Sequence, residues 1–196
     1  MAVQAERMQG LVEDLLTLSR LEGSPIPSVL NTLPLKQLID FCEQEANGLS
    51  NTITHGVNPH VIQFKVEPTL SKATLMGESR ELQSALSNLV SNAVRYTPSG
   101  GSINVSVDHG VDGSLLIDVR DTGAGIAAEH LPRLTERFYR VDRSRSRESG
   151  GTGLGLAIVK HVAQRHGAEL HIQSTPGKGS VFSIVFPNNR VNLSVA

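Results

Sequence analysis

The stretch from Arg80 to Tyr96, RELQSALSNLVSNAVRY, places the tightest constraint on how this chain can fold. Its apolar residues recur at alternating three- and four-residue spacing, which at about 100° per residue brings them onto one side of an α-helix. The pattern therefore predicts a helix that packs along one face against a core. The residues of this face are Leu82, Ala85, Leu86, Leu89, Val90 and Ala93.

The edge of the same helix carries polar residues of an unusual kind. Glu81, Asn88, Asn92 and Arg95 fall within a narrow arc beside the apolar face, so two amides four residues apart project together. A solvated face more usually carries Lys and Glu. Two carboxamides beside a core suggest the wall of a polar pocket, in which their oxygens can coordinate a hard cation such as Mg²⁺. Hydrogen-bonded surface amides are the simpler alternative, and these residues alone favour it.

The composition narrows the class of protein. The chain has 196 residues and a formal net charge of −1, so no overall field favours nucleic acid or an anionic membrane. Because Cys42 is the only cysteine, no internal disulfide can form, which fits a reducing compartment. The sequence shows no signal peptide and no apolar run long enough to span a bilayer. We therefore expect a soluble chain with one sizeable core, with or without a small appendage.

The N-terminal segment, residues 1–22, predicts a helix with the apolar spacing of a coiled-coil or bundle seam. The stripe is wider than a lone surface helix needs, so it implies partner helices that this chain does not contain. Packing onto its own domain is the less favoured alternative, because Pro25 and Pro27 lie in a stiff, extended linker over residues 23–28. The seam comprises Met8, Leu11, Leu15 and Leu18, widened by Val12, Leu16 and Leu21.

The main domain, residues 29–187, alternates between helical and strand patterns. Helices interspersed with antiparallel strand pairs predict an α+β fold, a two-layer α/β sandwich whose mixed, mostly antiparallel sheet is covered by helices on one face. Residues 188–196 show no pattern and are expected to form a disordered tail. Helices are expected at 34–49, with Pro34 as the first helical residue, and at 80–96, 127–134 and 154–166. Strands are expected at 29–33, 61–66, 74–76, 103–107, 115–119, 169–174 and 180–186.

The segment GGTGLGLAIVK, residues 150–160, has the features of a phosphate cradle. Gly151, Gly153 and Gly155 permit positive φ and close approach of the backbone, and the helix that follows offers free N–H groups and the positive end of its dipole. It does not match the dinucleotide-binding fingerprint, because its glycines fall at alternate positions and a polar loop precedes it. GKGS at residues 177–180 also fails the P-loop pattern, and we interpret it as a hairpin turn.

The segment DTGAGI, residues 121–126, places a carboxylate at the end of a strand, before a glycine turn. A buried Asp121 can accept a hydrogen bond from an exocyclic amine, and a charged bond of this kind contributes roughly 1.5–3 kcal/mol. Adenine offers such a donor, whereas guanine presents an oxygen there. The letters Asp-Thr-Gly-Ala also occur in dimeric aspartic proteases. That alternative leaves Asn88, Asn92 and the glycine cradle unexplained.

Arginines are concentrated in the irregular stretch before the glycine cradle. A solvated basic loop is the simplest interpretation, and contact with nucleic acid is a second one. A mobile lid that folds over a polyphosphate explains the charges and also their position in the chain. These residues are Arg133, Arg137, Arg140, Arg143, Arg145 and Arg147.

With these features in this order, the chain resembles the ATP-binding domain of sensor histidine kinases, in the GHKL superfamily shared with gyrase-type ATPases, Hsp90 chaperones and MutL-type repair proteins. The resemblance runs from about residue 5 to residue 187 and rests on NLVSNAVRYT, DTGAGI, RFYRVD and GGTGLGLAIVK. Residues 1–22 resemble the second helix of the dimerisation and phosphoacceptor hairpin. Within the family, RLTERFYRVDRSRSR is especially similar to the phosphate-regulon sensor kinases.

The resemblance implies a role for residues of the central helix and of the Asp-Thr-Gly turn. Asn92, with help from Asn88, would hold the Mg²⁺ that bridges the phosphates of ATP; Arg95 would reach a phosphate, and Tyr96 would lie by the adenine. Asp121 would accept a hydrogen bond from the exocyclic amine of adenine. Its pocket would be shaped by Gly123, Gly125 and Ile126, with Ala124 in place of the proline common in the family, which we expect to loosen the turn.

The resemblance also implies a role for the arginine-rich stretch and the cradle. Phe138 would anchor the lid, and Arg140 and Arg143 would reach the phosphates. The cradle would close over them through Thr152, Gly153, Leu154 and Gly155.

The implied activity is phosphoryl transfer from ATP to a histidine, and then to an aspartate of a response-regulator receiver domain. In the ATPase branches a Glu four residues before the metal-binding Asn activates water, whereas Asn88 cannot take that proton, so we expect slow hydrolysis. None of the seven histidines lies in the family's His-Glu-Leu-Arg-Thr-Pro-like context. We therefore expect the acceptor to lie on a hairpin helix outside this chain, which would not autophosphorylate alone.

The resemblance implies a homodimer formed through the hairpin helices of the intact protein. It also implies a cytoplasmic location, membrane attachment only through segments outside this chain, and no nucleic-acid partner. A nucleotide-binding pseudokinase without transfer activity is an alternative, and a dimeric aspartic protease is a remote one.

Overall fold

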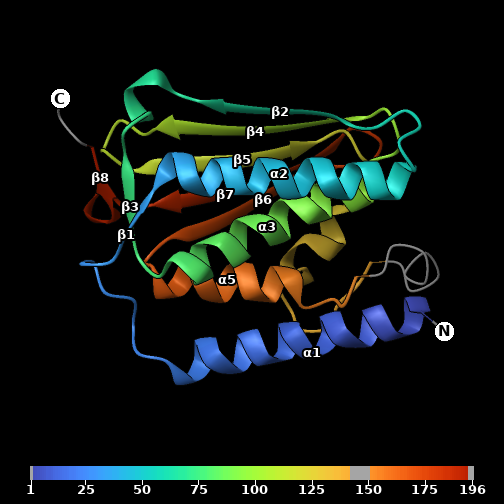
Figure 1. Cartoon of the computed structure of the whole chain (residues 1–196), viewed down its shortest axis with the longest axis horizontal. Coiled ribbons are helices and arrows are strands. Elements are labelled where there is room, and N and C mark those ends of the chain that lie inside the picture. Colours follow the sequence, from blue (N-terminus) through green and yellow to red (C-terminus); the bar gives the residue numbers. More distant parts are fainter. Residues whose placement is uncertain (1, 142–150, 194–196) are drawn as a thin grey trace.

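The computed structural model describes residues 2–141 and 151–193, with side chains from residue 8 onward. In this part of the chain the main sheet has five strands in the order β2-β4-β5-β7-β6 (Figure 1). Strand β2 is parallel to β4, and the other neighbouring pairs are antiparallel, which confirms the mixed, mostly antiparallel sheet. The strands are β2 (Val61–Val66), β4 (Ser102–His109), β5 (Leu115–Asp121), β6 (Glu169–Thr175) and β7 (Gly179–Phe186).

Three helices cover one face of this sheet (Figure 1), as the two-layer prediction requires. They are α2 (Leu35–Thr54), α3 (Ser79–Tyr96) and α5 (Gly155–Arg165). The whole apolar face predicted for the central helix is buried in α3, and it meets buried side chains of the sheet such as Ile103, Val105 and Val119. Among the described residues, no helix is long and apolar enough to cross a bilayer.

A second, small sheet lies at the edge of the domain; strands were expected at 29–33 and 74–76, but their pairing and the third strand were not predicted. It pairs β1 (Thr32–Pro34), β3 (Thr74–Met76) and β8 (Val191–Asn192) in antiparallel fashion. Pro34 therefore ends a strand and precedes α2, and is not its first helical residue. The expectation of a disordered tail is wrong for residues 188–192, which form a 3₁₀ turn (η3, Asn188–Arg190) and β8; residues 194–196 lie outside the described part.

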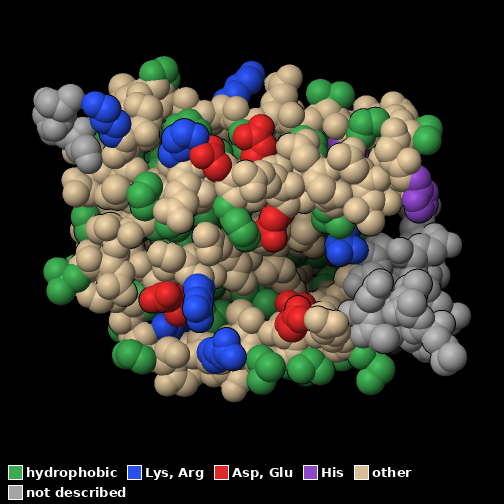
Figure 2. Space-filling view, in the orientation of Figure 1, with side chains coloured by type: hydrophobic (Ala, Val, Ile, Leu, Met, Phe, Trp, Pro, Cys, Tyr) green, Lys and Arg blue, Asp and Glu red, His purple; other side chains and the backbone are tan. Residues whose placement is uncertain are grey.

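The first helix, α1 (Ala2–Gly23), lies alongside α5 (Figure 1). Leu18 and Leu21 are buried in the common core, and Leu11 packs against it. Packing onto its own domain, the alternative less favoured by the sequence, is thus correct for one side of the helix. The other side is exposed, and Figure 2 shows hydrophobic side chains along it. These exposed residues are Met8, Val12, Leu15 and Leu16.

Candidate functional site

The ends of three elements meet at one end of the strands of the main sheet. They are the carboxyl end of β5, the last turn of α3 and the first turn of α5 (Figure 1). Contact between the first two is tight, because a β-carbon on Gly123 would lie 2.5 Å from the carbonyl oxygen of Tyr96. Contact between the two helices is equally tight, because a β-carbon on Gly155 would lie 2.4 Å from Oδ1 of Asn88. The predicted site residues of three separate motifs therefore converge.

Asp121 is the buried acid of this site, with 6% of its surface exposed. It ends β5, and its Oδ1 accepts a hydrogen bond of 2.7 Å from the N–H of Gly123. Burial raises the pKa of the Asp121 carboxyl, and hydrogen bonds from Gly123 and Ser180 oppose that shift. In this buried environment, the Asp121 carboxylate can accept a hydrogen bond from an amine of a ligand.

The turn after Asp121 depends on the absence of a side chain at Gly125. Its φ is +68°, and a β-carbon there would lie 2.0 Å from the carbonyl oxygen of Thr175. The turn is tied to the β6–β7 hairpin, because the carbonyl of Ala124 accepts from Gly177 N–H at 2.7 Å and Ile126 N–H donates to Ser174 Oγ at 2.8 Å.

Ser174 and Ser180 belong to this site but were missed by the sequence reasoning. Ser180 lies opposite Asp121 in the β5–β7 register, and its hydroxyl lies 2.9 Å from that of Ser174. The sequence predicts this strand and its hairpin with residues 169–174, but not its pairing with β5. Only the register of the two strands brings Ser180 to Asp121.

The two amides of α3 lie one turn apart, as predicted. The Nδ2 of Asn88 donates to the carbonyl of Ser84 at 2.8 Å, so this nitrogen is engaged and Oδ1 faces Gly155. Asn92 and Arg95 are half-buried further along the helix. In the described part of the chain no three His, Cys, Asp or Glu residues are placed to hold a metal ion. A cation here would use amide oxygens, which suit Mg²⁺ but would leave most of its coordination sites to water or ligand phosphates.

The glycine cradle is held by contacts to the arginine-rich stretch itself. Phe138, at φ +63°, donates its N–H to the carbonyl of Gly153 at 2.9 Å, and Arg140 donates to the carbonyl of Gly151. Tyr96 lies beside them, because a β-carbon on Gly151 would lie 3.7 Å from the Tyr96 hydroxyl. Arg143 lies outside the described residues, so its expected role is not tested.

The cradle ends in a turn at residues 152–154 that leads directly into α5. The side chain of Leu154 is fully buried, and its N–H donates to the hydroxyl of Thr152 at 3.2 Å. Within residues 2–141 and 151–193, no side chain caps the N-terminus of α5 at Leu154. The first N–H groups of this helix, beside Gly155, can therefore bind an anion.

The site can thus accept an amine at Asp121 and an anion at the cradle, with amide oxygens of Asn88 and Asn92 on one wall. A cavity of about 570 Å³ lies elsewhere, between the 3₁₀ segment η2 (Ala128–Arg133), α5 and β6, and no predicted site residue lines it. The segment expected as a helix at 127–134 is this 3₁₀ turn.

Comparison with known proteins agrees with these features. The family described as "Histidine kinase-, DNA gyrase B-, and HSP90-like ATPase" matches residues 77–190. The chain is 48% identical over 186 residues to the phosphate regulon sensor protein PhoR of Pseudomonas aeruginosa, covering 95% of this chain and 40% of that protein. It is 36% identical to the sensor-like histidine kinase SenX3 of Mycolicibacterium smegmatis, covering 95% of this chain and 46% of that protein. The chain therefore spans less than half the length of these curated relatives.

Solved structures show the same fold. Full-length ShkA in complex with AMPPNP superimposes with a TM-score of 0.76 at 26% identity, covering 96% of this chain and 37% of that chain. The mycobacterial sensor histidine kinase MprB gives a TM-score of 0.66 at 25% identity, covering 80% of this chain and 96% of that chain. The predicted α+β sandwich and the resemblance to sensor histidine kinases are confirmed. The chain belongs to the family of histidine kinase-, DNA gyrase B- and HSP90-like ATPases.

Proposed function

We propose that this chain is the catalytic, ATP-binding part of a two-component sensor histidine kinase that acts in phosphate sensing. The family match and the kinase relatives support the general activity, and the similarity to PhoR of P. aeruginosa supports the phosphate-sensing role. The observation that carries the proposal is the buried carboxylate of Asp121 in a glycine turn that contacts Tyr96 of α3, the helix whose Asn88 contacts Gly155 of the cradle.

In this proposal Asp121 accepts a hydrogen bond from the exocyclic amine of adenine. The turn of Gly123, Gly125 and Ile126 shapes the base pocket, and Tyr96 lies beside the base. Guanine has an oxygen where adenine has its amine, so two acceptors would face each other and binding would weaken. The site is thereby expected to select ATP over GTP.

The phosphates bind between the cradle and α3. The N–H groups of the Thr152–Gly155 turn and the guanidinium groups of Arg95, Arg140 and Arg143 neutralise their charge. Asn92 and Asn88 hold Mg²⁺ with their side-chain oxygens. The ion, when bound, draws charge from the phosphate oxygens and lowers the barrier for transfer of the γ-phosphoryl group.

Asn88 determines which acceptor is used. A carboxylate at this place could take a proton from water, whereas an amide oxygen is too weak a base to do so. The site therefore keeps ATP for a histidine nucleophile, carried on a helix of the dimerisation hairpin outside this chain. The intact protein would be a homodimer at the cytoplasmic side of a membrane, and would pass the phosphoryl group to an aspartate of a response-regulator receiver domain.

The test is calorimetric titration of the chain with ATP, with and without Mg²⁺, for the wild type and for Asp121→Asn. We expect Mg²⁺ to tighten binding, and the variant to bind about 10- to 100-fold more weakly, since a charged hydrogen bond of roughly 1.5–3 kcal/mol is lost. The matched control is Asp108→Asn, which removes one negative charge from an exposed residue of β4. It should bind ATP as the wild type does. Equal affinity of Asp121→Asn and the wild type, or equal affinity for ATP and GTP, would contradict the proposal.

A further inference from the structure

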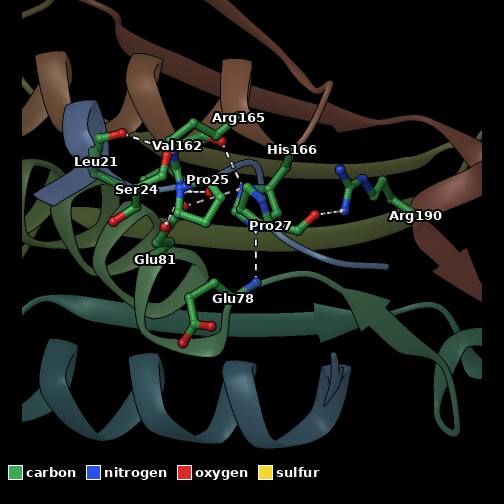
Figure 3. Close-up of polar contacts among 10 residues, drawn as sticks. All are labelled: Leu21, Ser24, Pro25, Pro27, Glu78, Glu81, Val162, Arg165, His166 and Arg190. Carbon is green, nitrogen blue, oxygen red and sulfur yellow. Dashed lines mark hydrogen bonds and ion pairs between the residues drawn. The ribbon is translucent and has the colours of Figure 1, made fainter. Parts of the chain in front are cut away.

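At the C-terminal end of α1, Arg165 of α5 donates the hydrogen bonds that tie the helix end and the linker to the domain. Nε and Nη2 of Arg165 each donate to the carboxylate of Glu81 at 2.9 Å (Figure 3). Nη1 donates to the carbonyls of Leu21 and Ser24 at 2.8 and 2.9 Å, and Nη2 to that of Pro25 at 2.7 Å. These contacts use all five N–H groups of the guanidinium. The position of α1 is therefore set by a saturated buried site and not by apolar contact alone.

From this anchor α1 runs back along α5 to the glycine cradle. Glu22 forms an ion pair with Arg137, in the segment that precedes the cradle. Further along, the carboxylate of Asp14 accepts a hydrogen bond from the hydroxyl of Thr152. Polar contacts thus join α1 to Arg137 of the arginine-rich stretch and to Thr152 of the cradle.

The contact of Asp14 lies at the place where the cradle would bind an anion. The Thr152 hydroxyl that donates a hydrogen bond to Asp14 also accepts one from the N–H of Leu154, the residue before α5. A half-buried carboxylate is therefore linked through two hydrogen bonds, by way of the Thr152 hydroxyl, to the N–H of Leu154, the residue before an 11-residue helix whose N-terminus no described side chain caps. Burial raises the pKa of Asp14, although the bond from Thr152 opposes the shift, so the charged form is held at an energetic cost.

We propose that Asp14 is a further determinant of the nucleotide site, an internal anion that opposes binding of the nucleotide phosphates while α1 is docked. The inference rests on the proposed function, because it assigns the phosphates to the cradle at Thr152. Two anions that share one turn repel each other, and the low exposure of the contact weakens screening. By thermodynamic linkage, nucleotide binding must loosen the docked helix by the same factor by which the docked helix weakens binding.

The test compares Mg-ATP affinity of the wild type, Asp14→Asn and Glu13→Gln by calorimetry. Asn keeps an oxygen that can accept from Thr152 but removes the charge, so we expect affinity to rise about tenfold, equivalent to about 1.4 kcal/mol. Glu13 is exposed on the neighbouring position of α1, and Glu13→Gln changes net charge equally. This control should bind within about twofold of the wild type. Unchanged or weaker binding by Asp14→Asn, or an equal gain in both variants, would overturn the inference.

A second measurement reports on α1 itself. Amide hydrogen exchange across residues 8–20 should become several-fold faster when Mg-ATP is added to the wild type, and should change less in Asp14→Asn. Unaltered exchange in the ATP-saturated wild type would overturn the linkage. Absence of any ATP binding by both proteins would instead count against the proposed function, so the two failures are distinguishable.

Discussion

The negative charge of Asp121 does not contribute to the stability of the fold. It is almost fully buried, and burial raises its pKa above the ordinary value of 3.8. A carboxyl with a raised folded-state pKa stabilises the protein below its unfolded pKa, and this contribution is lost as pH rises through the folded pKa. At neutral pH the ionised Asp121 therefore destabilises the native state, as expected of a residue retained for binding.

We predict that Asp121→Asn unfolds at a higher temperature than the wild type at pH 7, because the amide keeps an acceptor for Gly123 N–H and removes the buried charge. Thermal unfolding followed by circular dichroism at pH 7 and at about pH 4 measures the difference. The advantage of the variant should shrink at the lower pH, where Asp121 takes up its proton. A variant less stable than the wild type at pH 7 would show that the charge stabilises the fold.

The glycines of the turn after Asp121 and of the β6–β7 hairpin that contacts it differ in what they require: some need only a positive φ, and others also need the space that a β-carbon would fill. Gly125 needs both, whereas a β-carbon on Gly177, at φ +77°, would have no other atom within 4 Å among the described residues. We predict that Gly125→Ala loses clearly more stability in urea than Gly177→Ala, which should lose about 1 kcal/mol through backbone strain alone. Equal losses would mean that the turn can move away from Thr175 at no cost.

At the scale of elements, polar side chains form part of the contact between α3 and α5. Glu81 of α3 and Arg165 of α5 form an ion pair whose side chains are 14% and 13% exposed. Beside it His166 is fully buried; its Nδ1 lies 2.8 Å from the carbonyl of Val162, and its Nε2 accepts from Glu78 N–H at 3.2 Å. Burial lowers the pKa of His166, so it remains neutral and fixes the start of α3.

We predict that Glu81→Gln lowers the free energy of unfolding by about 3 kcal/mol, because it leaves the buried charge of Arg165 without its partner. The matched control is Asp40→Asn, which breaks an exposed ion pair with Lys36 and should change stability by less than about 0.5 kcal/mol. Urea denaturation of the two variants provides the measurement. A loss in Glu81→Gln no larger than in the control would show that this joint adds no stability.

At the scale of the whole molecule, nucleotide binding and phosphoacceptor are expected to reside in different parts of the kinase. We predict that the chain incubated with labelled Mg-ATP gains no acid-labile phosphate and hydrolyses ATP slowly, because Asn88 activates no water and no histidine lies in the acceptor context. Phosphate should instead appear on an added hairpin that carries the acceptor histidine. Labelling of the chain alone, or rapid ATP turnover, would contradict this division.

Local patterns predicted most of the secondary structure and singled out the candidate site residues that the fold brings together. The three- and four-residue spacing of Arg80 to Tyr96 predicted α3 and its buried face, and the alternation over residues 61–66 predicted β2 with its observed bounds. The motifs around Asn92, Asp121 and Gly153 lie largely within a single helix, turn or loop each. Such signals are local in the chain, so the sequence determined them by itself.

Other features depended on which segments meet. The strand β8 is two residues long and has too few positions to show a period, so only its pairing with β3 defines it. For the strand expected at 29–33, pairing with β3 decided the observed bounds, Thr32–Pro34. The strand register brought Ser180 to Asp121. The docking of α1 brought Asp14 to Thr152, across 138 residues of chain. These contacts were decided by the tertiary structure, because periodicity reports the face that a residue occupies and not the partner that the face will meet.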